Sequence, residues 1–297
     1  MSLMTEIRNI VRSGGIITQL IAINLAVFLF VNLTGVFLYL FLATPGGGNI
    51  IVNQLAIPAY MPNLLSKPWT LLSYMFLHKN FLHILFNILW LYWFGIIFLR
   101  YFNSKQLLGL YLLGGFVGGL FYVATFNLFP VFAPYLPMNI ALGASASVIA
   151  IVIATAVYVP NFVVYVFLIG PVKLKWIAMV MVVLDILGIA SDNSGGHLAH
   201  LGGAITGWIF ISAIKHQIDL TRFVPFIQDI FRFKRKKRRK LNISYRSGDT
   251  EHDYNQQRQQ RRADLDAILE KIKKSGYESL TKDEKEALFK YSSKRDL

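Results

Sequence analysis

Apolar residues gather into six long runs between Ile16 and Ile214. A helix needs about 20 mostly apolar residues to cross the hydrocarbon core of a membrane. The pattern therefore predicts six membrane-spanning helices, over residues 16–42, 81–99, 106–127, 141–159, 174–190 and 197–214. The first run is too long for the core of a signal peptide, so we expect it to be a retained span.

A further apolar segment, residues 162–170, is too short to cross a membrane and lies between Pro160 and Pro171. Proline lacks the backbone N–H that continues a helix, so it breaks helices at both ends of this segment. We interpret the segment as an interfacial or re-entrant piece, and not as a seventh span.

The composition agrees with a membrane protein. Only 15% of the 297 residues are charged, while 55% are hydrophobic. A soluble domain of this size carries more charge to solvate its surface. The chain has no cysteine, which excludes disulfides, thiolate nucleophiles and cysteine-ligated zinc.

The basic residues predict the orientation, because Lys and Arg accumulate in cytoplasmic loops. They precede the first span, separate spans two and three and spans four and five, and follow the sixth span densely. These residues are Arg8, Arg12, Arg100, Lys105, Lys173, Lys175 and the run 232–240. Both chain ends are then cytoplasmic, as an even number of spans requires.

Polar residues inside spans are costly unless paired, so each is a candidate for function. Four histidines mark the starts of spans two and six, namely His78, His83, His197 and His200, and Ser145 marks the start of span four. Even-numbered spans run in one direction. We therefore expect Ser145, His83 and His200 to lie in one layer near the outer leaflet.

Two stripes of small residues predict which spans meet, since such stripes let helix backbones approach closely in lipid. They consist of Ala146, Ala150 and Ala154 in span four and Ala199, Gly203 and Gly207 in span six. Ser145 and His200 each lie one residue from the top of a stripe. Packing along the stripes would place the hydroxyl beside the imidazole.

This pair suggests nucleophilic catalysis, because a serine hydroxyl attacks well only when a nearby base takes its proton. Ser145 also begins a helix, where backbone N–H groups lack partners and can hold an oxyanion. His83 and Asn87 share a helix face and are expected to add side-chain donors. A single membrane serine usually bonds to its own helix, and we interpret Ser147 and His197 as structural.

Three segments in this order resemble the motifs of the rhomboid family of intramembrane serine proteases. They are His78-Lys-Asn-Phe-Leu-His83-Ile-Leu-Phe-Asn87, Gly143-Ala144-Ser145-Ala146 and Ala199-His200-Leu-Gly-Gly203-Ala-Ile-Thr-Gly207. The resemblance covers residues 16–214. It implies a six-helix bundle and a Ser–His dyad without an aspartate, with Ser145 as nucleophile and His200 as general base.

The resemblance also implies an oxyanion hole made of His83, Asn87 and the Ser145 amide, and no catalytic role for His78. The outer loop, residues 44–69, would shape the lateral entry of substrate. Three positions depart from the family pattern. Ala146 stands where many members have glycine, Ile149 where many have an aromatic residue packing on the base, and Trp69-Thr70 where many have Trp-Arg.

Asp185 is an acidic residue inside the fifth predicted span. We interpret it as structural, since nothing in the sequence places it beside His200.

The C-terminal region is polar and basic. The run FRFKRKKRRK, residues 231–240, is expected to contact anionic lipid headgroups and not nucleic acid. Residues 241–262 read as a flexible linker. Residues 263–297 read as a small helical module with a stop at Gly276 and a capping box opening at Thr281. It resembles a module attached to rhomboids of Bacteroidetes-like bacteria, which implies a bacterial inner membrane.

The expected organisation is thus an all-α membrane protein with four parts. They are a cytoplasmic segment 1–15, a protease domain 16–214, a basic segment and linker 215–262, and the module 263–297. We expect transmembrane proteins as substrates, and no cofactor or metal. Three alternatives stay open: a metal-binding protein that uses the four histidines, a non-catalytic binder of transmembrane helices, and a transporter.

Overall fold

The computed structural model describes residues 15–44, 46–167, 169–226 and 251–293. Contacts divide the chain into two compact units, residues 1–233 and 234–297. Most of the described residues are helical. The two units are described separately below.

A helix occupies each of the six predicted positions. Four are long and apolar enough to cross a membrane: α2 (Ile16–Leu42), α6 (Phe81–Phe98), α7 (Ser104–Leu128) and α10 (Ser194–Lys215). Two are shorter, α8 (Ser145–Tyr158, 14 residues) and α9 (Leu174–Gly188, 15 residues). The chain is therefore a mostly helical membrane protein with four candidate spans in its described part, and the count of six spans stays a prediction.

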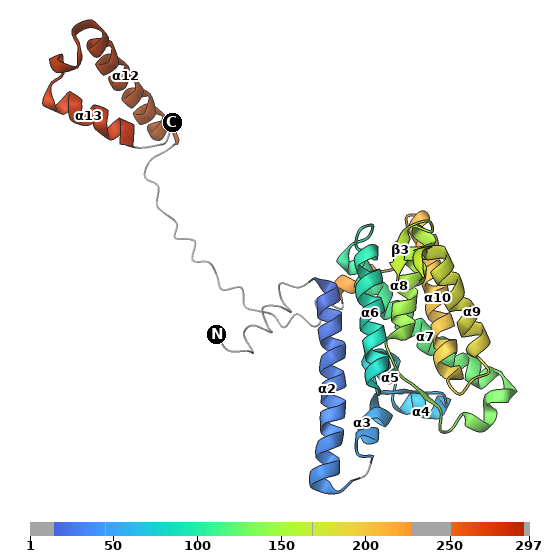
Figure 1. The fold of residues 1–297 in the computed structure, drawn as a ribbon. Coiled ribbons are helices and arrows are strands. Elements are labelled where there is room, and N and C mark those ends of the chain that lie inside the picture. Colours follow the sequence, from blue (N-terminus) through green and yellow to red (C-terminus); the bar gives the residue numbers. More distant parts are fainter. Residues whose placement is uncertain (1–14, 45, 168, 227–250, 294–297) are drawn as a thin grey trace. The chain divides into compact units, whose positions relative to one another are not determined.

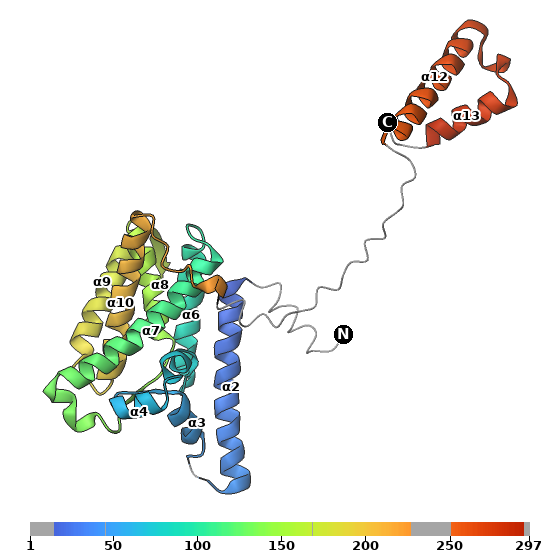
Figure 2. The ribbon, with the colours of Figure 1, turned by 180° about the vertical axis from the view of Figure 1, so that it is seen from behind.

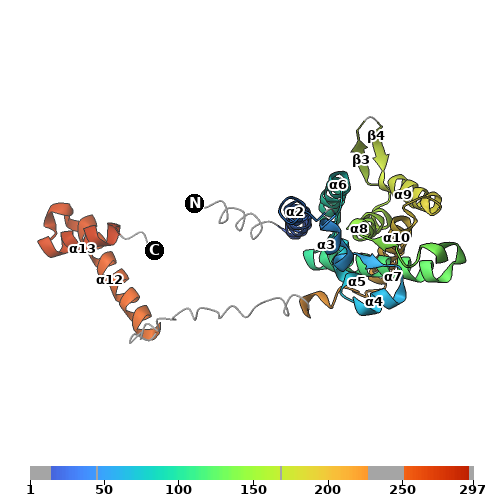
Figure 3. The same ribbon diagram turned by 90° about the horizontal axis from the view of Figure 1, so that it is seen from below.

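Helix α8 forms the centre of the first unit. Every residue from Ala146 to Ala156 is buried. Viewed from below, α8 lies among α6, α7, α9 and α10, and it contacts all four (Figure 3). By contrast, α2 stands at the edge of the bundle and exposes most of its surface (Figure 1).

Glycines allow neighbouring helices to touch the backbone of α8. A Cβ added at Gly203 or Gly207 would overlap the carbonyl oxygen of Ala146 or Ala150, respectively. The predicted packing of the two small-residue stripes is therefore confirmed. Helix α7, which crosses the back of the bundle obliquely (Figure 2), adds a third close approach, since a Cβ at Gly118 would lie 2.7 Å from Ala146 Cβ.

The segment between α2 and α6 contains short helices, which gather at one end of the bundle (Figure 1). They are α3 (Gly48–Leu55), α4 (Met61–Ser66), α5 (Thr70–Ser73) and the 3₁₀ helix η1 (Tyr74–Phe76). A second 3₁₀ helix, η2 (Pro130–Tyr135), follows α7. The first two of these elements lie within the loop that the sequence analysis assigned to residues 44–69.

Two short β pairings depart from the all-α expectation. Strand β1 (Ile57–Pro58) pairs with β2 (Ile140–Ala141), just before α8. Strands β3 (Val163–Val166) and β4 (Gly170–Lys173) form an antiparallel hairpin. Residues 163–166 of the segment 162–170 are thus one arm of a hairpin, because the β-branched residues and flanking prolines favour extended backbone.

The second unit consists of α12 (Glu251–Ser275), η3 (Tyr277–Ser279) and α13 (Lys282–Ser293). Gly276 adopts a φ of 76° where α12 ends, and the predicted capping box is present, with Thr281 N–H donating to Glu284 Oε2 at 2.7 Å. The predicted linker, residues 241–262, is helical from Glu251 onward. The interpretation of residues 251–262 as a flexible linker is therefore wrong, because their Gln and Arg residues are good helix formers.

The close contact at Gly203 predicts a specific sensitivity. We expect Gly203→Ala to lower the thermal midpoint of the detergent-solubilised protein by about 2–12 °C, because overpacking costs about 1–3 kcal/mol. Gly15→Ala is the matched control, since a Cβ at Gly15 meets nothing within 4 Å. Equal midpoints for the two variants would contradict the packing of α10 on α8.

Candidate functional site

Ser145 is the first residue of α8, and two hydrogen bonds anchor the turn that precedes it. The Gly143 N–H donates to the Tyr74 carbonyl oxygen at 2.9 Å. The Ala144 N–H donates to His78 Nε2 at 3.3 Å. The turn is therefore fixed to the segment that leads into α6, while Ser145 itself stays half-buried.

Gly143 brings the serine and an imidazole together. Its φ is 130°, which favours glycine, and a Cβ there would lie 2.7 Å from His83 Cε1 and 3.6 Å from Ser145 Oγ. The ring of His83 and the hydroxyl of Ser145 thus both border Gly143. A side chain at this position would displace the imidazole of His83.

His78 is fully buried and supports the same turn. Its Nε2 accepts the Ala144 N–H, so the ring is neutral and its proton is assigned to Nδ1. Burial, with a smaller contribution from His83, lowers the pKa of His78 to about 4. His78 thus holds the backbone turn that precedes Ser145, and its lack of a catalytic role stays a prediction.

Donors suited to an oxyanion lie around Ser145. Within the described ranges, its backbone N–H has no hydrogen-bond partner, as expected at a helix N-terminus. Asn87 lies one turn after His83 on α6 and is buried. Its Nδ2 donates to the His83 carbonyl oxygen at 2.8 Å, so one of its two amide hydrogens is already engaged.

His200 lies on α10 at the level of Ser145. Ala146 and Ala199, the chain neighbours of these residues, both border Gly118 of α7, because a Cβ there would lie 2.7 Å from Ala146 Cβ and 2.7 Å from the Ala199 carbonyl oxygen. No hydrogen bond joins the Ser145 hydroxyl to an imidazole nitrogen in the part of the chain that the structure describes.

Asp185 corrects the sequence interpretation, because it does lie beside His200. Its Oδ1 is 2.8 Å from His200 Nδ1 and also 2.8 Å from His197 Nδ1. The carboxylate is buried, and the two imidazoles are partly exposed. The signal in the sequence was the spacing of His197 and His200, which puts both on one helix face as partners for the acid of the neighbouring span.

The same three side chains are of the types that bind zinc, and one ligand atom from each lies within 4.8 Å of the others. The metal-binding alternative rested on the four histidines alone, and Asp185 adds a carboxylate beside two of them. His78 and His83 form a separate pair, with ring centroids 5.1 Å apart.

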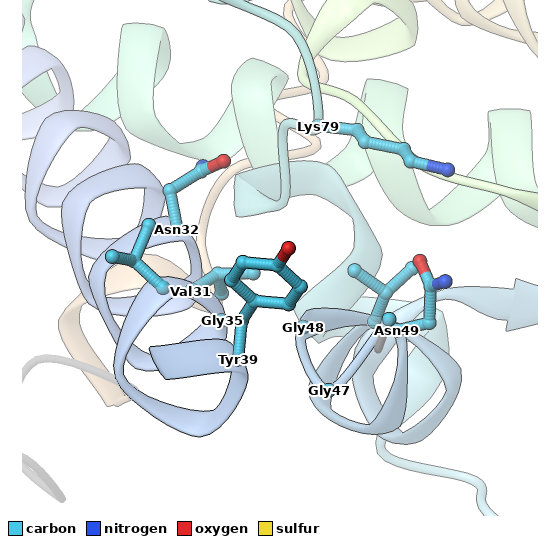
Figure 4. A pocket seen from close by; sticks show the side chains of 11 residues that line it. Val31, Asn32, Gly35, Tyr39, Gly47, Gly48, Asn49 and Lys79 are labelled. Atoms are coloured by element: carbon cyan, nitrogen blue, oxygen red, sulfur yellow. The ribbon is translucent and has the colours of Figure 1, made fainter. Parts of the chain in front are cut away.

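A groove lies elsewhere, between α2 and α3 (Figure 4). Its lining includes Asn32, Tyr39, Asn49 and Lys79. None of the predicted catalytic or oxyanion residues lines this groove.

A family model described as the Rhomboid domain matches residues 65–217, a range that contains all three motifs and Asp185. The chain belongs to the rhomboid family. A second model, a family of unknown function (DUF6576), matches residues 249–294, which include α12 and α13. The rhomboid domain thus carries the whole candidate site, and the C-terminal unit has a family of its own.

A curated relative supports the same family. RHOMBOID-like protein 12, mitochondrial, from Arabidopsis thaliana is 31% identical over an alignment of 155 residues, which covers 49% of this chain. The aligned part is 46% of that protein, so this rhomboid chain spans about half the length of the relative that it matches.

The buried His78 predicts how the stability of the rhomboid domain depends on pH. The folded chain keeps His78 neutral down to about pH 4, whereas the unfolded chain takes up the proton near pH 6.5. The contribution of His78 to the free energy of unfolding is therefore fully present above pH 6.5. It is lost as the pH falls towards 4, and the total loss is about 3 kcal/mol. Thermal midpoints measured across this range should fall less in His78→Gln than in the wild type.

His216→Gln is the control for this experiment, because His216 is exposed. Its midpoints should follow those of the wild type. A His78→Gln profile as steep as the wild-type profile would assign the loss to another group.

Proposed function

We propose that this rhomboid-family chain is an intramembrane serine endopeptidase, with Ser145 as the nucleophile and His200 as the general base. The observation that carries the proposal is the glycine-mediated contact of α8 with α10. It brings the backbone of Ala146 against Gly203 and thus the start of α8 to the level of His200.

The proposed chemistry begins when His200 Nε2 takes the proton of the Ser145 hydroxyl and the oxygen attacks a substrate carbonyl. The tetrahedral oxyanion accepts hydrogen bonds from the Ser145 N–H and from the side chains of His83 and Asn87. His200 then gives its proton to the leaving amine, and the peptide bond breaks. Water releases the acyl group from Ser145 by the reverse sequence.

The substrates of the proposed enzyme are transmembrane helices, cleaved near the outer leaflet. The expected setting is a bacterial inner membrane with both chain ends in the cytoplasm, where the basic run 231–240 contacts anionic lipids. That run lies outside the described residues.

A second candidate function, a non-catalytic binder of transmembrane helices, has one observation in its favour. Among the described side chains, Ser145 makes no hydrogen bond to His200. Catalytic hydrogen bonds often tighten only when substrate is bound, so this geometry does not exclude the enzyme.

Labelling with a fluorophosphonate probe separates the two functions, because the probe reacts only with an activated serine. We expect the purified full-length protein to be labelled, and Ser145→Ala and His200→Ala to abolish the labelling. Ser147→Ala is the control, since Ser147 is fully buried two residues further along α8 and should label normally if folded.

An unlabelled wild type, in a preparation that shows a cooperative thermal transition, would favour the helix binder. Labelling that survives Ser145→Ala would mean that another residue is the nucleophile. Cleavage of a reconstituted transmembrane substrate in liposomes then measures kcat and KM for active variants.

The oxyanion donors give a second prediction for the proposed enzyme. We expect Asn87→Ala to lower kcat by about 10²–10³-fold, because a lost donor weakens binding of the oxyanion. Asn32→Ala is a matched control, because Asn32 Nδ2 also donates to the carbonyl oxygen four residues earlier, on the exposed α2. Wild-type kcat in Asn87→Ala would remove Asn87 from the oxyanion hole.

A further inference from the structure

Helix α9 exposes most of its length but buries a charged group. Only Leu174 and Asp185 are buried among its residues, while apolar side chains such as Trp176, Leu184 and Leu187 face outward. A carboxylate in an apolar setting is costly unless it is paired. The burial of Asp185 therefore needs a compensating interaction.

The packing of α9 explains the direction of Asp185. Ala178, Met181 and Val182 pack into one cluster with side chains of α8 and α10, namely Ile149, Ile153 and Ala204. Asp185 follows Val182 by three residues and Met181 by four, so it continues the same helix face. The face that joins α9 to α8 and α10 thus ends in a carboxylate.

The carboxylate fixes the protonation pattern of the two imidazoles that it contacts. A carboxylate oxygen only accepts hydrogen bonds, so His197 Nδ1 and His200 Nδ1, both 2.8 Å from Asp185 Oδ1, are assigned as the N–H donors. The Nε2 of a neutral His200 then carries the lone pair. That nitrogen is the one able to take a proton from a serine.

We propose that Asp185 is a positioning residue that holds His200 in this tautomer and orientation, so that the site acts as a Ser145–His200–Asp185 triad. The inference rests on the proposed protease function. During proton transfer, the Ser145 proton moves to His200 Nε2, and Asp185 stabilises the resulting imidazolium without taking a proton itself.

His197 contacts the same Asp185 oxygen as His200 but takes no part in the proposed proton transfer. It lies one turn before His200 and donates to the same Oδ1 at the same distance. Removing it leaves the bond between Asp185 and His200 in place, so His197→Ala is a matched control for the loss of one partner of the carboxylate.

The test compares wild type, Asp185→Asn and His197→Ala as full-length proteins, in buffer with EDTA. The amide introduced by Asp185→Asn can turn and donate to His200 Nδ1, which would move the ring proton to Nε2. We expect Asp185→Asn to lower kcat by about 10²–10⁴-fold with little change in KM. His197→Ala should keep kcat within about threefold of the wild type, because it removes no group from proton transfer.

The ¹⁵N NMR spectrum of labelled histidine gives a readout that does not need activity. His200 should be protonated at Nδ1 in the wild type and at Nε2 in Asp185→Asn. A thermal midpoint for each variant shows whether it is folded. If the wild type is inactive towards the probe, the protease function fails, yet the tautomer still tests the contact.

Results of three kinds would overturn the triad. One is a wild-type His200 protonated at Nε2. Another is an unchanged kcat in folded Asp185→Asn, or an equal loss in His197→Ala, which would make the cluster a structural contact. The third is wild-type activity that EDTA abolishes and Zn²⁺ restores, which would make these side chains metal ligands.

Discussion

The contact between the backbone of α8 and the glycines of its neighbours is the interaction on which the rest of the domain depends. Lipid tails are as apolar as the side chains, so helices in a membrane gain little from hydrophobic burial and associate by close packing. Gly203 and Gly207 of α10 and Gly118 of α7 leave the space that α8 fills. The result is a short helix that is buried from Ala146 to Ala156 and begins at Ser145.

This packing determines where Ser145 lies along α10, and a separate set of backbone hydrogen bonds holds the turn that leads into it. The turn before α8 is paired to β1 through β2 and is held by Tyr74 and His78 through two backbone N–H groups. The positions of Gly143 and Ala144 therefore depend on Tyr74 and His78, which make no hydrogen bond to the Ser145 hydroxyl among the described residues. We therefore expect a substitution of His78 to alter the site by moving the backbone of Ala144, and not by removing a group that takes part in proton transfer.

The sequence predicted the positions of the helices because each one needs a long apolar run. It also predicted that the helices carrying Ser145 and His200 meet, since small-residue stripes mark the contact faces of α8 and α10. The contact of Asp185 with His200 could not be predicted, because α9 carries apolar residues on all sides and hydropathy then does not determine how that helix is rotated. The β3–β4 hairpin was not predicted, because a short apolar run fits a strand as well as a helix. The start of α12 at Glu251 was not predicted either, because the first part of this helix is polar and has no apolar periodicity.

The length of α8 has a consequence for how a peptide bond would reach Ser145. At 14 residues, α8 is about 21 Å long, whereas the hydrocarbon core is about 30 Å thick. If the C-terminal end of α8 lies at one interface, Ser145 at its other end lies inside the hydrocarbon, below the opposite face of the bilayer. A peptide bond inside an intact helix has its carbonyl engaged and shielded, so any chain cleaved at that depth has to unwind locally first.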